Sequence, residues 1–205
     1  MATHKLGYIT ASTFSPIIAG KKNELLVGAK TFAHQIALER LCLQGYIDKS
    51  YLDFEFDGNL YTDWGNKNEL EAISMFEKTY SCKIKNKQKV YEHQNYPYLS
   101  CTVDGEIGNN QLIEVKCPAK ASNHFKNILY NSWIKDYYDQ IQFQLFCSNK
   151  KLSKLISFDP RYIEKKRLHF VEIQPDLDWQ INFLNKYKLF QTEVQNIINN
   201  FMIEL

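Results

Sequence analysis

A mixed α/β fold, in which helices flank a mixed sheet, is the architecture that the sequence predicts. The predicted elements follow in the order helices, a meander of strands, helix, two strands and a helix, which is typical of such a sheet. Apolar residues recur at helical spacing in the first and last parts, whereas apolar and β-branched runs between turn residues fill the middle. The 205 residues, 44% of them hydrophobic, suffice for a sizeable core, and we expect one domain over residues 1–205.

Helix boundaries are predicted from capping residues and glycines, and strands from apolar runs between turns. The expected helices are a short one ending near Gly20 and segments 30–44, 64–80, 123–130, 133–147 and 178–201. Their expected N-caps are Thr10 or Ser12, Asp63, Ser122 and Ser132. The expected strands lie near residues 82–91, 98–103, 111–117, 155–159 and 168–173. The inward residues of the last helix are expected to be Phe183, Leu184, Tyr187, Val194, Ile198 and Phe201.

Two carboxylates and a lysine lie within apolar strand material, at Asp104, Glu114 and Lys116. Burying such charges is unfavourable unless each has a partner, and a divalent metal ion would be one. A hairpin centred on Asn109 would set Asp104 opposite Glu114, and facing residues have Cβ atoms about 4.5–5.5 Å apart. The two carboxylates would then share one ion, and the same hairpin would set Thr102 opposite Lys116.

Alternation along the strand would direct Glu114 and Lys116 to one face and Val115 into the core. Mg²⁺ prefers oxygen ligands, and a lysine beside it would hold or deprotonate the attacking water, with its pKa lowered by the cation and by burial. These residues favour a phosphodiester-cutting site. The alternative is a salt-bridged hairpin on a solvent-exposed face, because Asp, Glu and Lys at such spacing also occur by chance.

Composition indicates an intracellular protein without a strong bulk charge. The net charge of +2 does not indicate a nucleic-acid binder, so any contact with DNA must come from local patches. The five cysteines lack CxxC spacing, which argues against a zinc site and a disulfide framework. No signal peptide and no apolar run near 18 residues is present, so we expect neither secretion nor membrane insertion.

Two groups of basic residues are candidates for local patches. Lys83, Lys85, Lys87 and Lys89 alternate along one predicted strand. There they would line a DNA channel or, as we favour, protect an edge strand from aggregation. A second group near the ends of later strands would suit phosphate contacts. Its members are Lys150, Lys151, Lys154, Lys165, Lys166 and Arg167.

Short segments spread over nearly the whole chain occur in a recognisable order. They are residues 7–12, 64–72, 104–105, 112–118, 137–142, 159–161 and 168–169. In these segments the chain resembles the phage lambda-type alkaline exonucleases, the YqaJ-like viral recombinase family of the PD-(D/E)XK nuclease superfamily. The resemblance implies a restriction-endonuclease-like PD-(D/E)XK core with flanking helices, in a single nuclease domain.

The resemblance also implies an activity. Members of this family are Mg²⁺-dependent 5′-to-3′ exonucleases, in which we expect Mn²⁺ to substitute, and they degrade one strand of linear double-stranded DNA. The 3′ overhang serves recombination by a single-strand annealing protein, and the enzyme is a homotrimer ring that acts on DNA ends. A cytoplasmic location in a bacterial cell or phage-infected host follows. Two alternatives stay open: another PD-(D/E)XK nuclease, such as an endonuclease or resolvase, and a non-catalytic DNA-binding relative.

Site residues follow from the same resemblance. Asp104 and Glu114 look like central metal ligands, the carbonyl of Val115 like a backbone ligand, and Lys116 like the lysine that orients or activates water. We expect two-metal hydrolysis at these residues, in which a second ion lies nearer Glu69 or is shared with Asp104.

The remaining catalytic candidates lie on predicted helices. Glu69 matches the helix glutamate that completes the acidic site; by itself it would be a surface residue, and Glu71 is its rival on another helix face. Gln140 and Tyr137 match polar residues next to the active site, and their other interpretation is a polar stripe on an amphipathic helix.

Residues that would bind the DNA 5′-phosphate depart from the family pattern. The matching positions are Lys5, Ser12 and Thr102. Lysine in place of arginine keeps the charge but loses the bidentate fork, and threonine in place of serine keeps a hydroxyl. Val103 stands where the motif usually has proline, which changes backbone stiffness and leaves the ligands intact.

Overall fold

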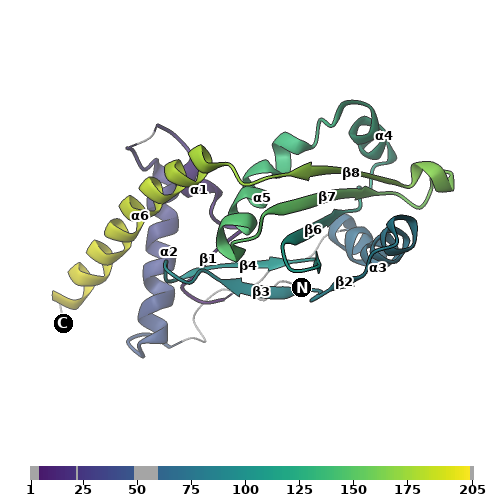
Figure 1. Cartoon of the computed structure of the whole chain (residues 1–205). Helices are drawn as coiled ribbons and strands as arrows, with labels where there is room; N and C mark the ends of the chain where they lie inside the picture. The colour runs from purple at the N-terminus through teal and green to yellow at the C-terminus, as the bar shows by residue number, and fades with distance from the viewer. Residues whose placement is uncertain (1–4, 22, 49–59, 204–205) are drawn as a thin grey trace. The chain divides into compact units, whose positions relative to one another are not determined.

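The computed structural model describes residues 5–21, 23–48 and 60–203 (Figure 1). The chain divides into two compact units with interleaved segments. The first comprises Met1–Glu55, Glu92–Ser100 and Asp176–Leu205, and the second comprises Phe56–Tyr91 and Cys101–Pro175. The predicted fold class, helices with mixed sheets, is confirmed. That residues 1–205 form one nuclease domain stays a prediction, because it depends on how the units are assembled.

A mixed sheet of five strands forms the centre of the second unit. The strands are β2 (Ile84–Lys85), β5 (Gly105–Ile107), β6 (Gln111–Lys116), β7 (Leu152–Phe158) and β8 (Leu168–Ile173), in that spatial order. β6 and β7 are parallel, and the other neighbouring strands are antiparallel. Parallel strands need a long crossover connection, which α4 (Ala121–Tyr130) and α5 (Ile134–Ser148) supply here.

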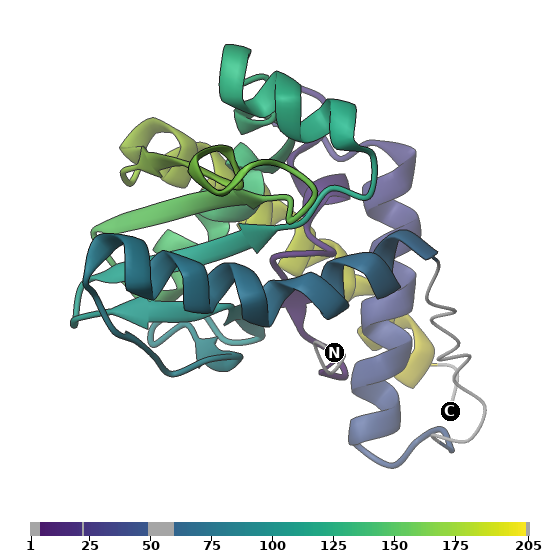
Figure 2. The same ribbon diagram turned by 90° about the vertical axis from the view of Figure 1, so that its right-hand side faces the viewer.

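Helices cover both faces of this sheet. In Figure 2, α3 (Leu60–Tyr80) lies across the strands. It packs on an apolar cluster that contains Ala72, Ile73, Phe76, Ile113, Val115, Ile156 and Phe158. Side chains alternate along β6, so Glu114 and Lys116 point to the opposite face, where they contact Gln140 of α5. The predicted division of Glu114 and Lys116 from Val115 is thereby confirmed.

The first unit packs three helices around aromatic side chains. They are α1 (Ser15–Ile18), α2 (Val27–Leu43) and α6 (Leu177–Ile203). Phe32 of α2 meets Phe190 of α6 with ring centroids 5.4 Å apart. In α6, Phe183, Tyr187, Val194 and Ile198 are buried as predicted, whereas Leu184 is half-buried and Phe201 is exposed. Within the described residues, the structure holds no helix with the length and apolarity that crossing a bilayer demands.

A second sheet begins in the first unit. β1 (Ile9–Thr10) pairs in parallel with the first residues of β4 (Leu99–Val103), and β3 (Lys89–Glu92) is the other neighbour of β4. The prediction that Thr102 faces Lys116 is therefore wrong, because β4 belongs to this sheet and does not pair with β6. The backbone carbonyl of Thr102 instead accepts a hydrogen bond from Gln144.

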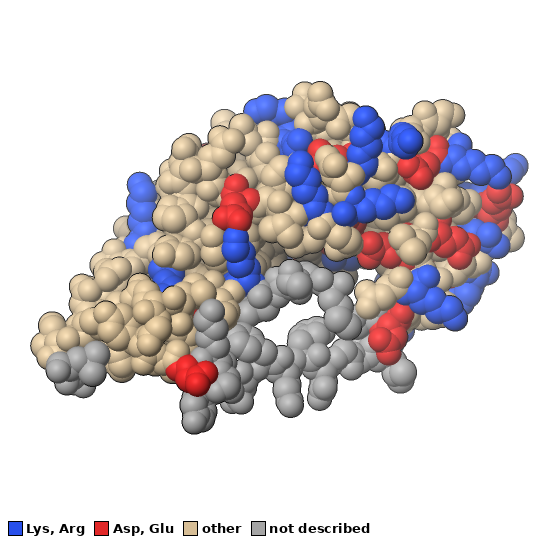
Figure 3. Space-filling view, turned by 90° about the horizontal axis from the view of Figure 1, so that it is seen from below, with Lys and Arg blue, Asp and Glu red and all other residues tan. Residues whose placement is uncertain are grey.

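The predicted strand over residues 82–91 is split in two. Asn86 and Gln88 have φ angles of 53° and 56°, and this left-handed backbone ends β2 before β3 begins. Hence Lys83, Lys85, Lys87 and Lys89 do not share one strand face. Lys89 pairs with Glu106, and in Figure 3 the basic side chains over the end that carries α3 and β2 alternate with acidic ones. The prediction that these four lysines lie on one face of a single strand is wrong.

The predicted helix caps are also wrong. The N-cap residues are Phe14, Lys120 and Trp133, and none of them makes a side-chain capping bond. The hydroxyls near α1 are used within the preceding turn, where Thr13 Oγ1 accepts the N–H of Thr10 and lies 3.0 Å from Thr10 Oγ1. α3 begins at Leu60, so Asp63 lies in its first turn.

Gly105 lets β2 approach the residue next to Asp104. A Cβ at position 105 would lie 2.4 Å from Cγ2 of Ile84, so β2 or β5 would have to move. We expect Gly105→Ala to lower the free energy of unfolding in urea by about 1–3 kcal/mol, as overpacked cores do. Gly28→Ala is the control, since a Cβ there meets no atom within 4 Å. Wild-type stability in the Gly105→Ala variant would contradict this account.

Candidate active site

A cleft of about 870 Å³ in the second unit collects most of the predicted site residues. Its walls come from α3, β6, α4, α5 and the bend after β4. The predicted residues among its lining are Glu69, Asp104, Glu114, Val115, Lys116 and Tyr137. Gln140 reaches the same place through hydrogen bonds to Glu114 and Lys116. Positions far apart in the sequence thus meet in one polar hollow, and their chemical roles stay predictions.

The strand register places Asp104 as the hairpin argument predicted. Ile107 faces Gln111 and Gly105 faces Ile113, so the turn is centred on Asn109. The pairing ends at Gly105, and at the next position the Asp104 carboxylate accepts a hydrogen bond of 2.7 Å from the backbone N–H of Val115. This bond holds Asp104 beside the strand that carries the second carboxylate.

Glu114 is buried and accepts three hydrogen bonds. Its Oε1 accepts hydrogen bonds from Nζ of Lys116 and from Nε2 of Gln140, each 2.7 Å long. Its Oε2 accepts a hydrogen bond from Nε2 of Gln144, also 2.7 Å long. Only 4% of the residue is exposed, and donors of this kind compensate a buried carboxylate for its lost hydration.

Lys116 lies between a carboxylate and an aromatic ring. Its Nζ is 4.6 Å from the ring centroid of Tyr137, in addition to its ion pair with Glu114. Burial alone would lower the pKa of Lys116, but the charges of Glu114 and Asp104 outweigh it and raise the pKa. Among the protein's own groups, the direction is therefore opposite to the predicted one. A lysine in this setting keeps its proton and acts as a fixed positive charge.

Two further carboxylates of the cleft are disfavoured as anions. Burial raises the pKa of Asp104 well above its ordinary value, and the charges of Glu114 and Glu69 add to this. Burial and Glu114 also raise the pKa of Glu69. The amide Nε2 of Gln88 lies 3.0 Å from Oε1 of Glu69 and 3.4 Å from Oδ1 of Asp104. A single donor group thus stands between the two carboxylates.

The donor set of this site suits a hard divalent cation. Carboxylate and carbonyl oxygens are what Mg²⁺ prefers, and it is usually held by one or two carboxylates with waters. A cation would also offset the burial and the repulsion that raise the pKa of Asp104 and of Glu69. In the described part of the chain, no three His, Cys, Asp or Glu side chains form a ready-made metal cluster. The fit is therefore to a water-rich magnesium site and not to a closed protein cage.

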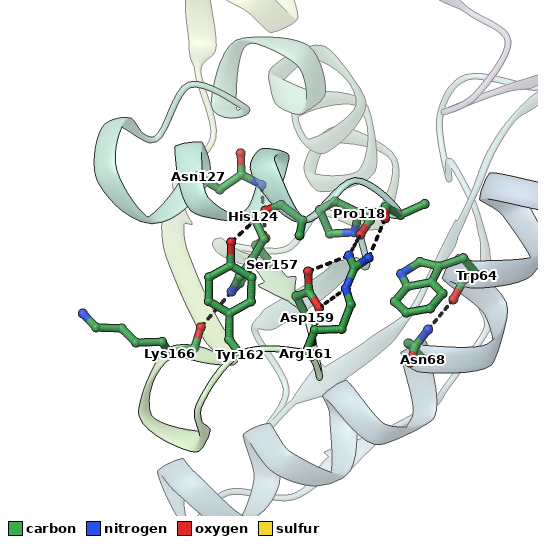
Figure 4. Close-up of polar contacts among 12 residues, drawn as sticks. Trp64, Asn68, Pro118, His124, Asn127, Ser157, Asp159, Arg161, Tyr162 and Lys166 are labelled. Carbon is green, nitrogen blue, oxygen red and sulfur yellow. Dashed lines mark hydrogen bonds and ion pairs between the residues drawn. The ribbon is translucent and has the colours of Figure 1, made fainter.

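Arg161 bonds to the chain segment that follows β6, as Figure 4 shows. Its guanidinium lies 4.5 Å from the ring centroid of Trp64 and donates to the carbonyls of Pro118 and Ala119. It also holds the buried carboxylate of Asp159 through two side-chain bonds of 2.8 and 2.7 Å. Pro118 and Ala119 line the cleft directly after β6, so Arg161 fixes the backbone there.

Replacing Arg161 by methionine should therefore destabilise the protein. Burial would raise the pKa of Asp159, but Arg161 holds it below its usual range. This contribution is complete above the unfolded pKa of an aspartate and is lost as the pH falls through the lower folded pKa. We expect a loss of about 1–3 kcal/mol in urea unfolding at pH 7, and a smaller loss near pH 3. Lys165→Met is the control, because Lys165 is exposed in the short helix that follows Arg161. It should change the free energy of unfolding little at either pH. A pH-independent loss would argue against the ion pair as its cause.

The predicted 5′-phosphate residues fall in different units. Lys5 and Ser12 belong to the first unit and Thr102 to the second. Lys5 forms an ion pair with Glu92 and lies 4.0 Å from the ring centroid of Tyr8. Ser12 is exposed. Their union in one phosphate site stays a prediction.

Several residues of the cleft were not foreseen from the sequence. Gln88 lies in a turn where a strand was expected, and Gln144 lies on the buried face of α5. Lys126 and Lys135 line the cleft from α4 and α5. Helical spacing offers a signal for Gln144 alone, because it follows Gln140 by one turn and shares its face.

Comparisons with known proteins agree with this architecture. A family model described as the YqaJ-like viral recombinase domain matches residues 3–151. The alkaline exonuclease LHK-Exo from Laribacter hongkongensis is similar with a TM-score of 0.78 and 19% identity, over 97% of this chain and 93% of that one. The structure of LHK-Exo in complex with dAMP is similar with a TM-score of 0.79 and 18% identity, again over 97% of this chain and 93% of that one. A phage-related exonuclease from Haemophilus somnus is similar with a TM-score of 0.71 and 18% identity, over 95% of this chain and 96% of that one. No curated protein matches the sequence. The likeness shows a common fold along nearly the whole chain.

Proposed function

Because the chain belongs to the YqaJ-like viral recombinase family, we propose that it is a Mg²⁺-dependent deoxyribonuclease that digests linear duplex DNA. The observation that carries the proposal is the meeting of Asp104, Glu114 and Lys116 with Glu69 and Gln140 at one cleft. Carboxylates that could hold a divalent metal ion, with a lysine beside them, supply chemistry that suits phosphodiester hydrolysis. The similar structures, an alkaline exonuclease and a phage-related exonuclease, support an exonuclease over an endonuclease.

Each residue has a role in this proposal. Asp104, Glu114 and the carbonyl of Val115 would hold one Mg²⁺, and Glu69 with Asp104 would hold a second. When bound, the metal supplies Lewis-acid activation of water and neutralises charge on the phosphate. Lys116 keeps its proton at Nζ and offers positive charge to the reacting phosphate, and Gln140, bonded to Lys116 and Glu114, orients both.

The finer features of the proposal follow the family. The enzyme would remove nucleotides in the 5′-to-3′ direction, leave a 3′ overhang for a single-strand annealing protein, and accept Mn²⁺ in place of Mg²⁺. It would act as a homotrimer ring with Lys5, Ser12 and Thr102 at the 5′-phosphate. LHK-Exo has been captured with dAMP, which belongs to the class of product that such an exonuclease releases.

The test is digestion of end-labelled duplex DNA in Mg²⁺, with and without a 5′-phosphate, beside a covalently closed circle. We expect release of 5′-mononucleotides from linear DNA, an intact circle, and no reaction in EDTA. Cutting of the circle would favour an endonuclease or resolvase. Binding of DNA without hydrolysis would favour a non-catalytic relative. A stable monomer at micromolar concentration in a sedimentation experiment would contradict the ring.

A further inference from the structure

Gln144 makes the two oxygens of Glu114 unequal. It lies on α5 one turn after Gln140 and is 1% exposed. Its Nε2 donates to Oε2 of Glu114 at 2.7 Å and to the carbonyl of Thr102 at 3.1 Å. Both amide hydrogens are thereby used in the interior. The other oxygen of Glu114 is shared by Lys116 and Gln140 at the cleft.

The orientation of the Gln144 amide is determined by its partners. A carboxylate oxygen and a carbonyl oxygen both accept, so the amide must turn its NH₂ group toward them. Its own Oε1 is buried and, among the described residues, has no hydrogen-bond partner. Native interiors seldom leave such an atom unsatisfied. The buried oxygen of Gln144 loses its hydration without a compensating hydrogen bond. The same orientation of the amide supplies a hydrogen bond to the buried carboxylate of Glu114.

We propose that Gln144 is a positioning residue that restricts Glu114 to a single metal-facing oxygen, Oε1, and so favours Mg²⁺ and Mn²⁺ over Ca²⁺. A carboxylate chelates one ion with both oxygens only when both face it, and here Oε2 is bonded inside the protein. Ca²⁺ takes six to eight ligands and often uses a bidentate carboxylate, whereas Mg²⁺ requires octahedral geometry with single oxygens and waters. This inference rests on the proposed metal site.

Binding of metal to the full chain tests the proposal without a measurement of activity. Mn²⁺ is titrated and the free ion is followed by its electron paramagnetic resonance signal, and Ca²⁺ is then added as the competitor. We expect Gln144→Met to weaken Mn²⁺ binding about tenfold to hundredfold, as loss of a residue that orients a ligand does. Preference for Mn²⁺ over Ca²⁺ should fall by a similar factor, because Glu114 becomes free to turn both oxygens to one ion.

Gln142→Met is the matched control. Gln142 lies on the same helix, is equally buried, and donates to the carbonyl of Gln174 and not to Glu114. It should keep the wild-type metal preference even where it loses stability. If circular dichroism shows that Gln144→Met does not fold, Gln144→Asn decides, since its shorter side chain withdraws the amide from Oε2.

The outcomes separate this inference from the proposed function. A wild-type protein that binds Mn²⁺, with variants at position 144 that keep its affinity and its preference over Ca²⁺, would overturn the role of Gln144 alone. A wild-type protein that binds no Mn²⁺ would overturn the metal site and this inference together. An equal loss of preference in Gln142→Met would show that general packing of α5, and not the bond to Glu114, sets the selectivity.

Discussion

Asp104→Asn is expected to abolish metal-dependent DNA hydrolysis and, at the same time, to stabilise the protein in EDTA at alkaline pH. Burial and the charges of Glu114 and Glu69 raise the pKa of Asp104 well above its ordinary value. Stability from a raised carboxyl pKa is complete below the unfolded pKa and is lost as the pH rises through the folded pKa. Above that range the Asp104 anion opposes folding, and asparagine removes the opposition. The asparagine oxygen still accepts the N–H of Val115 that Asp104 accepts now.

Thermal melts in EDTA at pH 5 and pH 8 measure the stabilising half of this prediction. The melting temperature of Asp104→Asn should exceed that of the wild type by a margin that grows with pH. The margin should be roughly 2–4 °C for each kcal/mol of unfavourable energy that is removed. Hydrolysis in Mg²⁺ should fall by about 10³-fold or more, because an electrostatic contact of the reaction is lost. Glu71→Gln is the control, since Glu71 is an exposed carboxylate on the same helix as Glu69. A lower melting temperature at pH 8 would show that Asp104 serves the fold and not the site.

The strand register explains why the centre of the site was predictable from the sequence. Side-chain alternation and a turn at Asn109 suffice to align Asp104 with Glu114, and both depend only on local backbone geometry. The same argument failed for Thr102, because a hairpin ladder is valid only while the strands remain paired. β4 leaves the β6 register at Asp104 and pairs with β1, a contact with a segment some ninety residues earlier in the chain.

The glutamines that donate hydrogen bonds to the carboxylates could not be predicted in this way, for a related reason. Gln88 reaches Glu69 and Asp104 from a turn whose left-handed residues interrupt the expected strand. Gln144 donates to Glu114 from α5, which covers the sheet face opposite to the one that α3 covers. Glutamine is uncharged and common on helices and loops, so its spacing alone does not distinguish a partner of the site from a surface residue. Only the packing of helix on sheet does so.

Lys116 separates two mechanisms that the sequence alone leaves open, and its substitutions form the second prediction of large effect. Lys116→Met removes the positive charge and should lower the rate of hydrolysis by roughly 10²–10⁴-fold. Among the protein's own groups, the neighbouring carboxylates raise the pKa of Lys116 despite burial, so we expect the lysine to be charged at neutral pH. A group that keeps its proton stabilises developing charge on the phosphate and does not accept a proton from water.

Lys116→Arg distinguishes these roles because arginine carries the same charge and does not deprotonate in proteins. If Lys116 acts as a charge, the arginine variant should retain at least about a tenth of the wild-type rate and keep the shape of its pH–rate profile. If Lys116 is the base, arginine should be as inactive as methionine. Both variants must first be shown to fold, since Nζ also pairs with Glu114 and contacts the ring of Tyr137. A rise of rate with pH that survives in Lys116→Arg would have to come from another group, because the residue at position 116 then titrates nowhere in the range.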